Sequence, residues 1–341
     1  MRPVRPRHCL AILLLWSLLL PLLAAQSGDP SPQDSQQGEP TETLRVDVNV
    51  VNVFFNVKDK KGLLISDLTK DAFILTEDEK PQTIKYFSSE ANQPLTLGLL
   101  VDTSPSQMRV LGMEQQVAAE FVRQILREKD LAFLINFDLS VDLQQDFTSN
   151  PRDLRSSLDE LRVRSGGPSG GPPGIGGGPL PPSANPKGTL LYDAVFLAAD
   201  EKLKNEVGRK AMIIFTDGQD QGSRTTIKEA IEAAQKSDAM CYVLLVADPE
   251  FYGRGGGYYG GTGPMKKLAE QTGGRLIEVG DDQEKLRKAF DQISNELRTQ
   301  YNIGYTPTNQ KKDGAFREVE IKTKDKNYKV QARAGYYAPS K

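Results

Sequence analysis

Hydrophobic and polar residues alternate along residues 44–57, which is typical of β-strands with one buried face. A Lys- and Gly-containing turn follows at residues 58–62. Residues 73–75 and 83–87 are two further short apolar runs with strand-forming composition. No helical stripe interrupts them. The pattern therefore predicts an N-terminal β module over residues 44–94.

The pattern changes at residue 95, where a continuous apolar run indicates a strand that is covered on both faces. From there, apolar runs alternate with stripes of period 3.6. Strands are expected at residues 95–101, 130–137, 141–147 (an edge strand), 211–217, 240–248 and 275–279, and helices at residues 107–129, 151–163, 190–203, 226–236, 264–271 and 283–297. This alternation predicts an α/β domain over residues 95–298, with a doubly wound, mainly parallel sheet and helices on both faces.

Strand patterns return after residue 298. The segments 300–305, 317–324 and 328–337 are rich in β-branched and aromatic residues. We expect the C-terminal strands in residues 299–341 to pair with residues 44–94. The two chain ends would then form a small β-sandwich-like module that flanks the α/β domain.

The first 25 residues have the three parts of a secretory signal peptide: three arginines, an apolar stretch and a Leu-Ala-Ala cleavage site. The apolar stretch is shorter than the ~20 residues that span a membrane, and Pro21 interrupts it. No transmembrane segment is therefore expected after cleavage. Residues 26–43 are polar and read as a disordered linker. We expect an exported protein, located in the periplasm, on the cell surface or in the medium.

Composition then removes several classes of chemistry. His8 and Trp16 are the only residues of their types, and both lie in the signal segment with Cys9. After cleavage the chain keeps one cysteine, Cys241, and 40 basic against 45 acidic side chains. This excludes Ser-His-Asp and Cys-His catalysis, zinc sites of His and Cys, and an intrachain disulfide. A net charge of −5 also argues against a nucleic-acid partner.

Two Gly-rich segments, residues 165–188 and 251–263, interrupt the α/β pattern where open α/β sheets bind ligands. Ser169 fits a G-x-S-x-G motif but lacks a preceding strand and a histidine, so we do not regard it as a nucleophile. The G-x-G-x-x-G match at residues 255–260 does not open a helix, so it is no phosphate loop. The second segment carries residue types common at interfaces, which makes it a candidate partner-binding loop: Tyr252, Arg254, Tyr258 and Tyr259.

Carboxylates and hydroxyls gather at three separate junctions of the predicted α/β domain. Asp102, Ser104 and Ser106 follow its first strand, Thr189 starts a helix, and Asp217 ends another strand. Such an oxygen-only set suits Mg²⁺, Ca²⁺ or Mn²⁺. Each residue alone has a structural alternative, because the hydroxyls are also helix N-cap residues and the aspartate is also a turn residue. Together they predict a metal site.

The motifs DTSPS (residues 102–106), GTLLYDA (188–194) and TDGQD (216–220), in this order, resemble the three loops of the metal-ion-dependent adhesion site (MIDAS) of von Willebrand factor type A (VWA) domains. The resemblance spans roughly residues 95–298, and the flanking segments resemble exported VWA-related proteins of acidobacteria. The sequence departs from the family in Pro105, where glycine is usual, and in the long insertion before Thr189.

The resemblance implies a divalent cation, most often Mg²⁺, held by Asp102, Ser104, Ser106, Thr189 and Asp217. It also implies that an Asp or Glu carboxylate of a partner protein supplies the last ligand. Asp220 would stand outside the direct ligands, or would be a plain helix cap. The expected function is therefore an exported, metal-dependent protein-binding or adhesion module and not an enzyme.

Two alternatives stay open. One is a scaffold of a cell-envelope assembly, in which the metal does not bridge to a partner. The other is a metal-dependent phosphoesterase with Asp102 as nucleophile, although the chain lacks the D-x-D pairing that leaves a second carboxylate for acid–base work.

Overall fold

The computed structural model describes residues 50–89, 93–163, 188–248, 250–251 and 261–340. The predicted signal peptide (1–25) and linker (26–43) lie outside these residues. So do almost all of the Gly/Pro-rich segment and the four residues of the candidate partner-binding loop, Tyr252, Arg254, Tyr258 and Tyr259.

A six-stranded sheet forms the centre of the α/β domain, with the strand order β10-β9-β8-β5-β6-β7. Its strands are β5 (Leu95–Asp102), β6 (Leu131–Phe137), β7 (Val141–Thr148), β8 (Arg209–Thr216), β9 (Ala239–Leu245) and β10 (Leu276–Glu278). All neighbours are parallel except β7, which runs antiparallel to β6 at the edge. The strand order reverses between β5 and β8, so this is a doubly wound sheet, as predicted.

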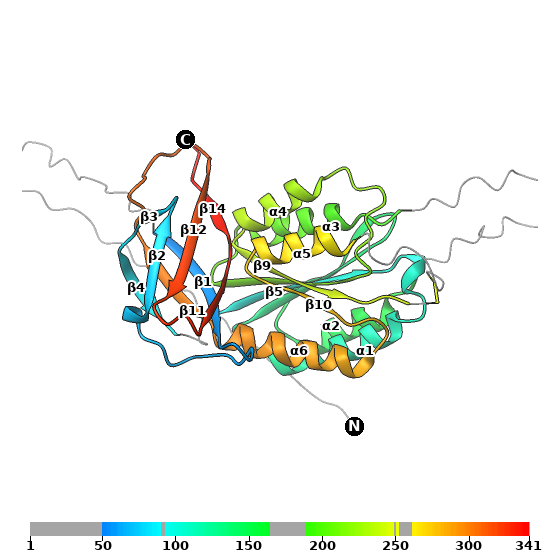
Figure 1. Ribbon diagram of the computed structural model, residues 1–341. Coiled ribbons are helices and arrows are strands. Elements are labelled where there is room, and N and C mark those ends of the chain that lie inside the picture. Colours follow the sequence, from blue (N-terminus) through cyan, green and yellow to red (C-terminus); the bar gives the residue numbers. More distant parts are fainter. Residues whose placement is uncertain (1–49, 90–92, 164–187, 249, 252–260, 341) are drawn as a thin grey trace, which may run out of the picture. The chain divides into compact units, whose positions relative to one another are not determined.

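Helices cover both faces of this sheet (Figure 1). One face carries α1 (Leu111–Ile125), α2 (Pro151–Glu160) and α6 (Gln283–Arg298); the other carries α3 (Leu191–Leu197), α4 (Ile227–Lys236) and α5 (Thr262–Gln271). Side chains of β5 alternate between the two cores: Leu97 and Leu99 pack on the α1 side, and Leu100 on the α3 side. The structure thus confirms the architecture that the resemblance to VWA domains implied.

Several element boundaries differ from the predicted ones. The helix expected over residues 107–129 begins only at Leu111, because Pro105–Gln107 forms a separate 3₁₀ turn (η2). Proline suits the first position of such a turn, since its fixed φ is compatible and its missing N–H is not needed there. The helix expected over residues 190–203 changes at Ala198 into a π-helical turn, η3 (Ala198–Leu203).

Two four-stranded antiparallel sheets form the β module, with the orders β13-β1-β11-β4 and β14-β12-β2-β3. Their strands are β1 (Val51–Lys58), β2 (Phe73–Glu77), β3 (Lys80–Pro81), β4 (Ile84–Ser88), β11 (Tyr301–Tyr305), β12 (Phe316–Thr323), β13 (Lys329–Ala332) and β14 (Gly335–Tyr337), and a 3₁₀ turn, η1 (Lys70–Ala72), precedes β2. Strand β1 pairs with β11 and β13, and β2 pairs with β12. Both sheets therefore combine the two chain ends, as predicted.

The two sheets share one aromatic core. Phe55 of β1 lies edge-on to Phe73 of β2, with ring centroids 5.2 Å apart, and stacks on Tyr301 of β11 at 5.4 Å. These rings come from opposite ends of the sequence, so their packing fixes one end of the chain against the other.

Within the described part of the chain, every helix is too short or too polar to cross a lipid bilayer.

Candidate metal centre

The predicted metal-ligating residues lie at the carboxyl ends of β5 and β8, the two neighbouring strands at which the strand order reverses. In open α/β sheets this switch point is the usual place for a ligand. Asp102 is the last residue of β5, and Asp217 follows the last residue of β8. The parallel register pairs Val101 with Phe215, which brings Asp102 beside Thr216.

Asp102 is fully buried, and each of its carboxylate oxygens accepts a hydrogen bond. The backbone N–H of Ser104 donates to Oδ1 at 2.9 Å, and the hydroxyl of Thr216 donates to Oδ2 at 2.8 Å. The Thr216 hydroxyl in turn accepts the N–H of Gly218 at 3.0 Å. Asp102 is thereby held in one orientation by donors from both strand ends.

The two serines of the first loop face each other. Their Oγ atoms lie 3.0 Å apart, and both residues are buried. The turn at Pro105 brings them together, because the N–H of Gln107 bonds to the carbonyl of Ser104 at 2.9 Å. Ser104 is the N-cap residue of this turn, but its hydroxyl makes no capping hydrogen bond, and the N-cap of α1 is Val110. The helix-cap alternative for these serines is therefore wrong.

Thr189 is buried in the second loop, between the third loop and the end of β6. Its N–H and carbonyl exchange hydrogen bonds with the backbone of Gln221, at 3.2 and 3.0 Å, and the next N–H, of Leu190, bonds to the carbonyl of Asp138 at 2.9 Å. The N-cap position of α3 is Leu190, so Thr189 does not cap this helix. The cap alternative is wrong here too.

Asp217 is buried in the third loop, where its Oδ1 accepts the N–H of Gln219 at 2.9 Å. The next residue, Gly218, has φ +84°, a left-handed conformation that favours glycine. The backbone of Gly261, before α5, lies directly against it: a Cβ atom at Gly261 would be 2.0 Å from the carbonyl oxygen of Gly218. A glycine pair therefore holds the third loop at this position.

The electrostatics of the centre favour a cation. Burial, together with the negative charge of Asp217, raises the pKa of Asp102 to about 7. Two buried carboxylates that repel each other in this way are stabilised by an opposite charge between them. The described residues contain no cluster of three or more His, Cys, Asp or Glu side chains that could hold a metal ion. A cation at this place would therefore depend on the hydroxyls of Ser104, Ser106 and Thr189, which are oxygen ligands of the kind that Mg²⁺ accepts.

Asp220, in the third loop, caps the start of helix α3. Its Oδ1 accepts the N–H of Tyr192, in the first turn of α3, at 3.2 Å, and the hydroxyl of Ser223 at 2.6 Å. Ser223 Oγ also accepts the N–H groups of Tyr192 and Asp193. The third loop thus fixes the start of the helix that follows Thr189.

Sequence reasoning missed two residues beside the centre. Thr216, the donor to Asp102, is the last residue of β8 and directly follows the apolar run Ala211–Phe215. Glu114 of α1 is buried, and burial, Asp102 and Asp217 all raise its pKa. A signal for Glu114 was present in the sequence: it lies on the apolar face of the helix, three residues before Val117 and seven before Phe121.

An ion pair connects the first loop to the segment after β9. Arg109 Nε lies 3.5 Å from Asp248 Oδ2, and its guanidinium also contacts Glu250. Arg109 and Glu250 are exposed, so this contact adds little stability.

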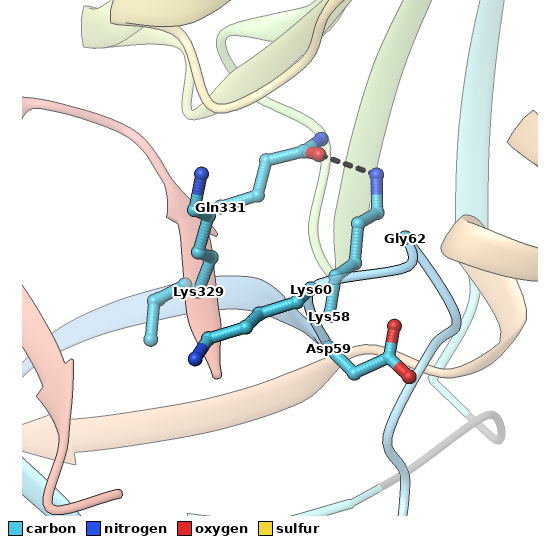
Figure 2. A pocket seen from close by; sticks show the side chains of 7 residues that line it. Lys58, Asp59, Lys60, Gly62, Lys329 and Gln331 are labelled. Carbon is cyan, nitrogen blue, oxygen red and sulfur yellow. Dashed lines mark hydrogen bonds between the residues drawn. The ribbon is translucent and has the colours of Figure 1, made fainter. Parts of the chain in front are cut away.

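A surface hollow of about 350 Å³ lies elsewhere, on β1 and β13 of the β module (Figure 2). Three lysines line it, but Lys58 already donates 2.8 Å hydrogen bonds to Glu296 and Gln331. The carboxylate of Asp59 accepts two backbone N–H groups of its own turn. No set of side chains converges on this hollow, so it is not the candidate site.

No family model matches the chain, and no curated protein matches it. Solved structures do resemble it. The conserved hypothetical protein BatB from Bacteroides thetaiotaomicron is 18% identical, with 60% of this chain and 99% of that one covered and a TM-score of 0.44.

Two other similar structures contain a MIDAS motif or a VWA domain. Proximal thread matrix protein 1 from the mussel byssus, with a zinc-occupied MIDAS motif, is 14% identical over 64% of this chain and 48% of that one, with a TM-score of 0.46. The SpRpn10 VWA domain is 11% identical over 58% of this chain and 94% of that one, with a TM-score of 0.39. At these identities the likeness is one of fold.

Proposed function

We propose that this chain binds a partner protein through a divalent cation held at the carboxyl ends of β5 and β8. Asp102, Ser104, Ser106, Thr189 and Asp217 hold the cation, which is Mg²⁺ under ordinary conditions. A carboxylate of the partner, from Asp or Glu, supplies a further ligand.

One observation supports this proposal above the others. Asp102 is a fully buried carboxylate whose pKa rises because of its burial and of a second carboxylate, Asp217. Beside it lie two serine hydroxyls 3.0 Å apart that cap no helix. Buried charges of the same sign are costly unless an opposite charge compensates them. A hard cation with oxygen ligands satisfies both the charges and the hydroxyls.

The chemistry of the set favours binding over catalysis. Three of its five side chains are neutral, so the two carboxylates together just balance a divalent cation. The cation keeps enough positive character to attract an outside carboxylate. Two carboxylates also make a site of limited affinity, because hard-cation sites tighten as charged ligands are added.

Selection of displayed random peptides on the full chain in MgCl₂, with elution by EDTA, tests this function. The selected peptides are expected to depend on one Asp or Glu, and its replacement by Asn or Gln should abolish binding. Asp217→Ala should bind none of them. Asp159→Ala, which removes an equally charged but exposed side chain from α2, should bind like the parent. Peptides that bind Asp217→Ala as well as the parent would rule out capture through the metal.

The peptide selection, together with a hydrolysis assay, separates the two alternatives. A scaffold with a non-bridging metal would bind Mg²⁺ and select no carboxylate-dependent peptide. A phosphoesterase would hydrolyse p-nitrophenyl phosphate with Mg²⁺ and lose this activity in Asp102→Ala.

We also propose that the chain is exported, on the basis of the signal-like residues 1–25. N-terminal sequencing of the exported product should give Gln26 as the first residue. A product that keeps residues 1–25 would contradict cleavage.

A further inference from the structure

Glu114 is a buried glutamate whose carboxylate receives no hydrogen bond from the described residues. It lies in the first turn of α1 and is 1% exposed. Neither of its carboxylate oxygens has a hydrogen-bond partner among the described residues. Leaving a buried polar group without a hydrogen-bond partner destabilises a fold, and more so when the group is charged. A glutamate in this setting requires a compensating interaction.

The charged groups that act on Glu114 are those of the candidate centre. Burial raises the pKa of Glu114, and the negative charges of Asp102 and Asp217 raise it further. A second buried acceptor without a partner in the described part of the chain lies in the first loop. Gln107 has a buried Oε1 without a partner among the described residues, while its Nε2 lies 3.5 Å from Ser106 Oγ. Two acceptors beside the centre therefore lack donors.

Glu114 is not placed to be a direct ligand of the same ion. The described residues contain no group of three carboxylates that could hold a metal together, so Glu114 stands outside the set formed by Asp102 and Asp217. A hard cation such as Mg²⁺ keeps several water ligands when a protein binds it. These waters are hydrogen-bond donors, and they are what unsatisfied acceptors near the ion require.

We propose that Glu114 is a positioning residue of the metal centre: its carboxylate accepts hydrogen bonds from water ligands of the bound cation and strengthens cation binding. This inference rests on the proposed function, because it needs the cation to be there. It assigns the centre a third carboxylate, on α1, beyond the three loops.

Two opposite effects follow from removing this charge. Without metal, burial and the charges of Asp102 and Asp217 disfavour the ionised form of Glu114, and glutamine has nearly the shape of the uncharged acid, so the variant should be at least as stable as the parent in EDTA. With metal, the variant lacks the acceptor for the bound waters. Loss of such an outer partner typically lowers metal affinity 10–100-fold. A residue with a purely structural role would instead lose stability in EDTA and leave the affinity of the folded chain unchanged.

Calorimetric titration of the full chain with MgCl₂ alone, with thermal unfolding in EDTA beside it, tests the inference. Glu114→Gln and Glu114→Met should both bind Mg²⁺ at least tenfold more weakly than the parent while melting at the same temperature or higher in EDTA. The control is Glu120→Gln on the same helix, which removes the same charge from a side chain that pairs with Arg287. Its Mg²⁺ affinity should equal that of the parent.

Parental Mg²⁺ affinity in both Glu114 variants would overturn the inference and leave the proposed function standing. Variants that are unfolded in EDTA, where the parent is folded, would overturn it as well. A parent chain that binds no Mg²⁺ at all would instead contradict the proposed function itself.

Discussion

The hydroxyl of Thr216 donates a 2.8 Å hydrogen bond to Oδ2 of Asp102, across the two strands between which the sheet reverses its order. Both groups are fully buried. The bond joins the first and third loops directly, so the orientation of one carboxylate depends on a residue 114 positions away in the sequence.

Removing this donor should weaken the protein. Thr216→Val keeps the shape of the side chain but leaves Asp102 Oδ2 without a donor, which should cost about 1–3 kcal/mol of unfolding free energy. Urea unfolding at pH 8 in EDTA, where Asp102 is ionised, measures this loss. Thr216→Ser keeps the hydroxyl and should recover most of the stability. Equal losses in the Val and Ser variants would show that the methyl group, not the hydrogen bond, matters.

The close approach of Gly261 to Gly218 should be required for full Mg²⁺ affinity. Gly261→Ala would place a Cβ atom 2.0 Å from the carbonyl oxygen of Gly218, so the backbone of the third loop or of the start of α5 must shift. We expect Mg²⁺ affinity to fall at least tenfold in a calorimetric titration. Gly263→Ala is the matched control, because a Cβ there meets nothing within 4 Å. Unchanged Mg²⁺ affinity in Gly261→Ala would show that metal binding does not depend on the present position of Asp217.

Stability without metal should decrease as pH rises. The pKa of Asp102 is about 7 in the folded chain and near 3.8 when unfolded. The folded chain therefore holds this proton more tightly, and the resulting stability is complete below about pH 4 and lost as pH rises to about 7. For Asp102 alone the loss is on the order of 4 kcal/mol.

Urea unfolding in EDTA between pH 4 and pH 8 measures this loss. Asp102→Asn cannot titrate, so its stability should vary less over the range. Saturating Mg²⁺ should reduce the loss in the parent, because the cation then replaces the proton. Identical pH profiles of parent and Asp102→Asn would refute the assignment of this titration to Asp102.

The β module should need both chain ends. Within residues 44–94, β2 and β3 are the only described strands that pair with each other. Strands β1 and β4 pair only with C-terminal strands, and β2 pairs with C-terminal β12 as well as with β3. A fragment of residues 44–94 should therefore be unfolded alone, whereas residues 95–298 should fold. NMR spectra of the two fragments provide the measurement. A well-dispersed spectrum from residues 44–94 would contradict a module shared between the ends.

Much of the fold could be predicted because its signals are periodic. Continuous apolar runs marked β5 and β8 as buried strands, and the alternation of strands with helices indicated the doubly wound sheet. The exact ends of the helices and strands were harder to predict from the sequence. The first helix starts after the turn at Pro105, and apolar spacing alone does not reveal where a turn gives way to a helix.

The candidate site was predictable to the extent that its residues stand in short motifs at strand ends. The motifs do not show which residues of the folded chain interact with these ligands. Thr216 and Glu114 act through neighbours that only the folded sheet and helix bring close. A buried glutamate on an apolar helix face was visible in the sequence, but its relation to Asp102 and Asp217 depends on how α1 packs on the sheet.

The central claim is that Asp102 and Asp217 hold a divalent cation, and calorimetric titration of the full chain with MgCl₂ or MnCl₂ tests it most directly. The parent should bind one ion per chain, and the double variant Asp102→Ala/Asp217→Ala should bind none while circular dichroism shows an intact fold. The control Asp159→Ala/Asp291→Ala removes two exposed carboxylates from helices and should bind like the parent. Unchanged metal affinity in Asp102→Ala/Asp217→Ala would contradict the account.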